Sequence, residues 1–139
     1  MKRNLIIIGL ICLLAPLAHA QGLEQYQNRQ SDLTNLAGIF GELHHLRRTC
    51  EPRFEADVWR DRMKKLLDLE EPQATDREKM IAAFNNGYRD AQRRYRGCDR
   101  RARDYAASRA SDGDIIVRRL TAQLRQDEGP ELVVGPRPY

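Results

Sequence analysis

The hydrophobic positions of the chain fall into several segments with helical spacing. Between residues 31 and 50 the apolar positions recur every three or four residues, and Ser31 or Asp32 can cap the start of such a helix. These positions are Leu33, Leu36, Phe40, Leu43 and Leu46. Pro52 ends this first helix. The pattern then predicts a second helix from about residue 55 to residue 69, with Trp59, Met63, Leu66 and Leu67 on one face.

A third helix is predicted from about residue 75 to residue 96. The sequence from Thr75 to Glu78 matches a capping box, in which the threonine oxygen and the glutamate side chain each bind a backbone amide of the first turn. Gly97 follows as a terminator. We expect its core face to consist of Ile81, Phe84, Tyr88, Ala91 and Tyr95. Within it we expect a buried Asn85, with Gly87 allowing a close approach between helices.

The remaining sequence predicts one or two further helices. A segment with Ala102, Tyr105, Ala106 and Ala110 is expected to break at residues 111–113. A last helix should follow and end near residue 126, with Ile115, Ile116, Leu120 and Leu124 as its apolar positions. Residues 127–139 are rich in glycine and proline, and we expect a disordered tail there. The fold class is therefore predicted to be all-α, a small antiparallel bundle of four to five helices over residues 31–126.

The first 20 residues are typical of an export signal. Lys2 and Arg3 precede an apolar run over residues 5–17, and the triplet Ala18-His19-Ala20 is of the kind that precedes signal-peptidase cleavage. The run has about 13 residues, fewer than the roughly 20 that a membrane span needs. We therefore expect cleavage after Ala20, no transmembrane segment in the mature chain, a flexible leader over residues 21–30 and a periplasmic location.

Once this signal is removed, Cys50 and Cys98 are the only cysteines. An exported chain with two cysteines is expected to form a disulfide. Short connections make successive helices antiparallel, so both cysteines should lie at the same end of the bundle. We interpret the pair as structural, because catalytic dithiols usually occur as C-x-x-C. This disulfide completes the predicted fold.

The charge of the mature chain is small but unevenly distributed. Without Lys2 and Arg3, the 24 basic residues become 22 against 20 acidic residues, and the net charge falls from +4 to +2. Positive charge gathers from Arg89 to Arg109, where a stripe at helical spacing is predicted: Arg89, Arg93, Arg96 and Arg100. Arginines in this arrangement can bind phosphates or carboxylates. The alternative is a solvated face, or one paired with acidic residues of the second helix.

Other candidate chemistry is sparse. Glu42 and His45 have the Glu-x-x-His spacing of di-iron bundles, but such sites need a second copy of the motif, and the mature chain has no histidine besides His44 and His45. We expect both histidines at the polar edge of the core stripe, with no metal and no other cofactor bound. Glu42, Glu51, Glu55 and Asp57 are close enough in sequence to consider paired-carboxylate hydrolysis, although acidic residues on helices are usually solvated.

Three strings in the sequence resemble an uncharacterised family of small exported proteins of Gram-negative bacteria. They are GELHHLRRTC, WRDRMKKLLDLEEP and IAAFNNGYRDAQRRYRGC, and the resemblance extends over about residues 36–119. It implies an envelope-associated protein with both cysteines as a shared feature, and it supplies no catalytic residues.

These observations favour a non-enzymatic binding or scaffold module of the cell envelope. Its expected partner is an anionic envelope component or an acidic protein, because of the arginine stripe. Export argues against a nucleic-acid partner. The alternative is a hydrolase that acts on cell-wall polymer through helix-borne carboxylates.

Overall fold

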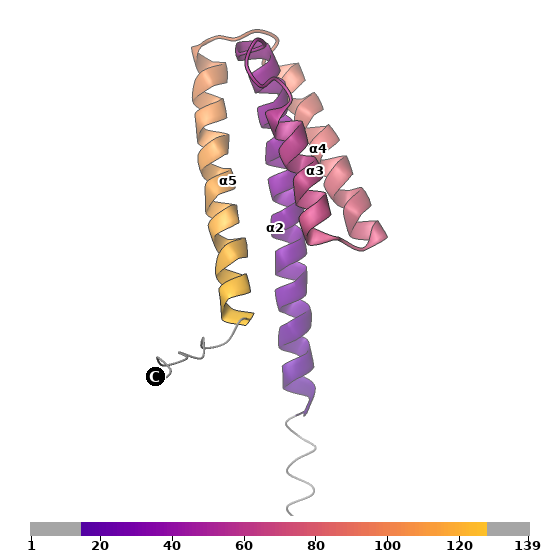
Figure 1. Cartoon of the computed structure of the whole chain (residues 1–139). Helices are drawn as coiled ribbons and strands as arrows, with labels where there is room; N and C mark the ends of the chain where they lie inside the picture. Colours follow the sequence, from indigo (N-terminus) through magenta and orange to yellow (C-terminus); the bar gives the residue numbers. More distant parts are fainter. Residues whose placement is uncertain (1–14, 128–139) are drawn as a thin grey trace, which may run out of the picture.

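The computed structural model describes residues 15–127, with side chains described for residues 21–125. This part of the chain is all-α, as predicted, and contains four helices: α2 (Ala15–Cys50), α3 (Val58–Glu70), α4 (Ala74–Arg94) and α5 (Arg100–Asp127). Figure 1 shows α2 between α5 on one side and α3 and α4 on the other. None of the described helices combines the length and apolar character needed to span a bilayer.

Helix α2 forms the centre of the bundle, because each of the other helices packs against it. Its apolar stripe supplies half of the core, and the other helices add only a few large side chains each. The buried members on α2 are Leu33, Leu36, Ala37, Ile39 and Leu43, and those on the other helices are Met63, Leu67, Met80, Ile116 and Leu120. Leu33 and Met80 are wholly buried. One long helix therefore positions the other three.

The predicted antiparallel topology and disulfide are both confirmed. Helix α3 runs back along α2, α4 runs in the same direction as α2, and α5 returns (Figure 1). Cys50 and Cys98 consequently lie at the same end of the bundle and form a disulfide, with their Cα atoms 4.9 Å apart. The disulfide ties the end of α2 to the connection between α4 and α5, so the α2–α3 and α4–α5 connections share one end of the molecule.

The structure differs from the flexible leader expected over residues 21–30, since these residues belong to α2. Side chains of this segment bind the far ends of the other helices. Tyr26 donates a hydrogen bond to Asp76 on α4 (2.8 Å), and Arg29 forms a two-pronged ion pair with Glu70 on α3 (2.8 and 2.9 Å). These contacts stabilise a segment of α2 that has no apolar periodicity of its own. The predicted export signal, residues 1–20, lies outside the described side chains.

The predicted capping box is not formed. Helix α4 begins at Ala74, one residue early, and Gln73 stands at the N-cap without a side-chain hydrogen bond. Thr75 therefore lies inside the first turn. Asp76 of the same turn binds Tyr26 and Lys79 instead. At the other end α4 stops at Arg94, before the predicted end at residue 96.

The break expected at residues 111–113 is also absent, because α5 is continuous through it. Gly113 is buried against α2, and a Cβ atom there would lie 3.5 Å from Ile39 and 3.7 Å from Leu36. Asp112 is held by an ion pair with Arg109, one turn back. This packing outweighs the roughly 1 kcal/mol by which glycine disfavours a helix interior. The tail from residue 128 lies outside the described residues.

Glycines set the distance between α2 and α4. A Cβ atom on Gly41 would lie 1.9 Å from the carbonyl oxygen of Phe84, and one on Gly87 would lie 2.1 Å from the carbonyl oxygen of Gly38. The two backbones are therefore in direct contact, as predicted for Gly87. The companion expectation for Asn85 is wrong, because this residue is exposed. Ile81, expected in the core, is 40 % exposed, and its neighbour Met80 is buried in the core instead.

Candidate binding groove

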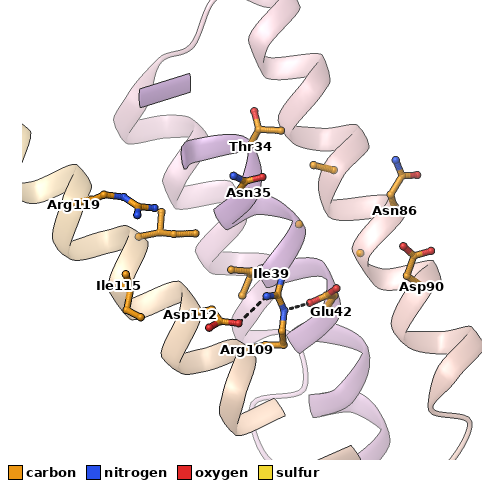
Figure 2. Close-up of a pocket in the computed structure, with 14 residues that line it drawn as sticks. Thr34, Asn35, Ile39, Glu42, Asn86, Asp90, Arg109, Asp112, Ile115 and Arg119 are labelled. Atoms are coloured by element: carbon orange, nitrogen blue, oxygen red, sulfur yellow. Dashed lines mark hydrogen bonds and ion pairs between the residues drawn. The ribbon is translucent and has the colours of Figure 1, made fainter. Parts of the chain in front are cut away.

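A polar groove runs between α4 and α5, with α2 as its floor (Figure 2). Its volume is about 580 Å³. The floor carries Asn35 and Glu42, the α4 wall carries Asn86 and Asp90, and the α5 wall carries Arg109, Asp112, Ile115 and Arg119. Residues from three helices, far apart in sequence, thus line one surface.

The groove exists because α4 and α5 each pack on α2 rather than on one another. The backbone contacts at Gly41 and Gly87, which we call the glycine crossing, hold α4 close to α2. Helix α5 contacts α2 through one narrow stripe that includes Gly113, Ile116 and Leu120, all of them buried. A single stripe covers less than half of a helix surface, so the flank of α5 that faces α4 stays open.

The groove is organised by a network around Glu42. Arg109 Nε donates a hydrogen bond to one carboxylate oxygen of Glu42, and the hydroxyl of Tyr105 donates to the other at 3.1 Å. Arg109 also donates to Asp112 at 2.8 Å. The Glu42 side chain is only 12 % exposed. Both of its oxygens are therefore occupied, and the network ties the floor of the groove to the α5 wall.

The electrostatics of this network follow from its partial burial. Burial raises the pKa of the Tyr105 hydroxyl, and the nearby Glu42 carboxylate raises it further. Burial acts to lower the pKa of Arg109, but the hydrogen bond and charge of Glu42 outweigh it and the net pKa is raised. Tyr105 therefore stays neutral and Arg109 stays charged throughout the physiological pH range.

A second ion pair lies further along the groove. Arg119 on the α5 wall binds Asp32 on α2 through two hydrogen bonds, of 2.8 and 3.0 Å. Asn35 lies between this pair and Glu42, and its amide has no hydrogen bond within the described residues. At the disulfide end the rings of Tyr95 and Tyr105 pack against each other, with centroids 5.0 Å apart and planes tilted by 31°.

The family described as "Protein of unknown function (DUF2385)" matches residues 28–124. The chain belongs to this family. No curated protein and no solved structure matches the chain. The DUF2385 region contains every residue of the groove, both cysteines and the packed part of all four helices.

The structure separates the four arginines of the predicted stripe. Arg89 and Arg93 lie on the exposed face of α4, Arg96 lies in the α4–α5 connection, and Arg100 begins α5. Arg93 pairs with Asp90, and Arg100 lies 3.7 Å from Asp104, each within its own helix. None of the four pairs with α3 in the described structure, so the alternative of a stripe paired with the second helix does not hold.

The two histidines are buried, which corrects their expected place at the polar edge of the core. His45 Nε2 is 2.7 Å from the carbonyl oxygen of Tyr95, so it tethers α2 to the end of α4. His44 packs against the rings of Phe84 and Tyr88, and its Nδ1 has no hydrogen-bond partner among the described residues. Burial lowers the pKa of His44, partly offset by Asp57, whose Oδ1 is 3.9 Å from Nε2.

The four carboxylates considered for hydrolysis are not brought together. Glu42 faces α5 in the groove, whereas Glu51, Glu55 and Asp57 lie in the connection between α2 and α3. Glu51 pairs with Arg47, and Asp57 lies near Arg48. Within residues 21–125, no group of three or more potential metal ligands is close enough to hold an ion.

Sequence reasoning missed Arg109, Asp112 and Asn35. A detectable signal was present for one of them, because Arg109 occupies a position on the contact stripe of α5, between Ala106 and Gly113. A charged residue on such a stripe needs a partner on the facing helix. Asn35 has no comparable signal, since its position in the groove depends on the distance between α4 and α5.

Proposed function

We propose that this DUF2385 protein is a non-enzymatic binding or scaffold module of the cell envelope, acting in the periplasm after cleavage of residues 1–20. The location is supported by the export-type N-terminus. The binding role is supported by one observation above all, the polar groove lined by three helices. Its charged side chains hold one another in place through ion pairs and hydrogen bonds.

The groove is suited to recognition because its shape is set before a partner arrives. Glu42, Arg109 and Asp112 hold the floor and the α5 wall in register, and the glycine crossing fixes the α4 wall. Preorganised walls lower the entropic cost of binding. Asn35 and Ile115 remain available to a partner, since both are exposed and line the groove.

Site-specific photo-crosslinking in the periplasm tests this proposal. A photoreactive residue at Asn86 or Ile115, one on each wall, should capture a defined partner. The matched control is Glu78, which is exposed on α4 but does not line the groove. Adding Asn35→Trp, which fills the floor at an exposed position, should abolish capture without lowering the melting temperature.

Equal capture from Glu78, or capture that survives Asn35→Trp, would contradict a groove-based binding role. Clearing of purified cell wall by the protein, lost in Glu42→Gln or Glu55→Gln, would instead establish the hydrolase considered as the alternative.

A further inference from the structure

The end of the bundle that carries the disulfide has a second surface, formed by residues 89–104, which meets the groove only at Asp90. We call this surface the arginine corner. It comprises the end of α4, the α4–α5 connection and the start of α5. Its arginines are Arg89, Arg93, Arg94, Arg96, Arg100, Arg101 and Arg103, all exposed.

The net positive charge of the arginine corner exceeds that of the whole mature chain. Its seven arginines face three aspartates, a net charge of +4. Because the chain from residue 21 onward carries +2 in total, all its other residues together carry −2. The charge is therefore polarised toward this one region.

Most of these arginines are not neutralised within the described structure. Asp90 pairs with Arg93, Asp104 lies near Arg100, and Asp99 instead accepts the backbone N–H of Ala102 at 2.8 Å. The other five have no carboxylate partner among the described residues: Arg89, Arg94, Arg96, Arg101 and Arg103. Their charge remains available to a partner.

Helix stability does not account for the arginines of α5. Arg100, Arg101 and Arg103 stand in its first turn, which contains no acidic residue. The helix dipole favours anions at an N-terminus and disfavours cations there. These three positions therefore carry a small cost in folding.

An exposed aromatic residue lies at the same end of the bundle. Phe54, in the α2–α3 connection, is 70 % exposed. Its backbone is fixed, because its N–H donates to the carbonyl oxygen of Glu51 (3.2 Å) and its carbonyl oxygen accepts from Arg47 Nε (3.2 Å). The disulfide links this connection to the arginine corner. The fold thus presents an apolar ring and a cluster of free cations at one end.

We propose that this end docks on a bilayer surface containing anionic phospholipid, with the free arginines on lipid phosphates and Phe54 at the boundary between headgroups and acyl chains. Guanidinium groups bind phosphate oxygens through paired hydrogen bonds. The strength of binding to a membrane interface increases with the apolar area buried and with the electrostatic attraction to anionic lipids, and this end contributes to both. An acidic protein would match the arginines but would leave the role of Phe54 unexplained. The inference rests on the proposed envelope location and identifies one partner of the module.

Vesicle co-sedimentation of the mature protein tests the inference. The probes are vesicles of phosphatidylethanolamine with phosphatidylglycerol, and vesicles of phosphatidylethanolamine with phosphatidylcholine. We expect binding only to the first, weakening as salt screens the charges. The variant Arg96→Glu/Arg101→Glu should lower the partition coefficient by at least about tenfold. Phe54→Ser should lower it by several-fold at unchanged charge.

The matched control is Arg77→Glu/Arg125→Glu. It changes the net charge by the same amount, and both residues are exposed on the parts of α4 and α5 far from the disulfide. It should retain most of the binding, and thermal melts should show all variants folded. Equal loss in both double variants, or no binding of the wild type to anionic vesicles, overturns the inference. Groove crosslinking that succeeds alongside failed vesicle binding would leave the proposed function standing and remove the lipid from it.

Discussion

At the glycine crossing between α2 and α4, the same substitution at two neighbouring glycines should change the free energy of unfolding in opposite directions. In Gly87→Ala the new Cβ atom would lie 2.1 Å from the carbonyl oxygen of Gly38, whereas ordinary contact begins near 3.4 Å. The shortfall of about 1.3 Å falls on backbone atoms, which a side-chain rotation cannot relieve. In Gly38→Ala the nearest atom is 3.8 Å away, so the methyl group fits.

The magnitudes follow from two opposing effects. Alanine is better than glycine in a helix interior by about 1 kcal/mol, and this gain applies at both positions. Overpacking a tight contact costs about 1–3 kcal/mol, or more where the backbone must move. Separating α4 from α2 would also open the core around Met80, which is wholly buried. Because the clash in Gly87→Ala falls on backbone atoms, we expect its overpacking cost to be about 3 kcal/mol or more. After the gain in helix propensity, Gly87→Ala should lower the free energy of unfolding by about 2 kcal/mol or more, whereas Gly38→Ala should raise it by up to about 1 kcal/mol.

Urea denaturation followed by circular dichroism, with the disulfide intact, measures both effects. A loss of 1 kcal/mol corresponds to roughly 4–8 °C in melting temperature for a domain near this size. Gly41→Ala should behave like Gly87→Ala, because its Cβ would lie 1.9 Å from a carbonyl oxygen of α4. A Gly87→Ala protein as stable as the wild type would refute the close approach of the two helices and the groove geometry that depends on it.

Three further predictions concern the groove, a buried histidine and the disulfide. Arg109→Met leaves the Glu42 carboxylate without its cation in a largely buried position, so it should destabilise the protein more than the double variant Glu42→Gln/Arg109→Met. A double-mutant cycle should give a coupling energy of about 0.5–3 kcal/mol between the two residues, and zero coupling would show that the pair is not formed in solution. Burial lowers the pKa of His44; Arg48 and Arg60 lower it further, and Asp57 raises it by less than these together. The unfolded chain therefore binds more protons at this residue than the folded chain does below about pH 6.5. Stability should therefore fall as the pH drops from about 6.5 to the lowered pKa, by at most about 1.4 kcal/mol per pH unit, and a slope undiminished in His44→Gln would assign it to another group. Replacing both cysteines with serine should lower the free energy of unfolding by about 4 kcal/mol, because the disulfide spans a sequence separation of 48 residues. Mass spectrometry of periplasmic material should show the Cys50–Cys98 link, and two free thiols would contradict it.

The sequence by itself determined the features that depend on neighbouring residues along the chain. Apolar spacing located the packed part of each helix, and Pro52 marked the end of the first one. Two cysteines in a chain expected to be exported, together with short connections, predicted both the disulfide and its position at one end of the bundle. Gly87 was correctly assigned to a close helix contact. Glycine disfavours a helix interior, so its presence there indicates a packing requirement that offsets this cost.

Tertiary structure decided the features that depend on contacts between distant residues. Residues 21–30 carry no apolar periodicity, yet they are helical because Tyr26 and Arg29 bind α4 and α3. The break expected at residues 111–113 is absent because α2 fills the space beside Gly113. The groove could not be read from sequence, since Glu42 and Arg109 are 67 positions apart and meet only when α5 folds back along α2. Local propensity sets which segments can be helical, and side-chain contacts across the bundle set where the helices end and which polar groups face each other.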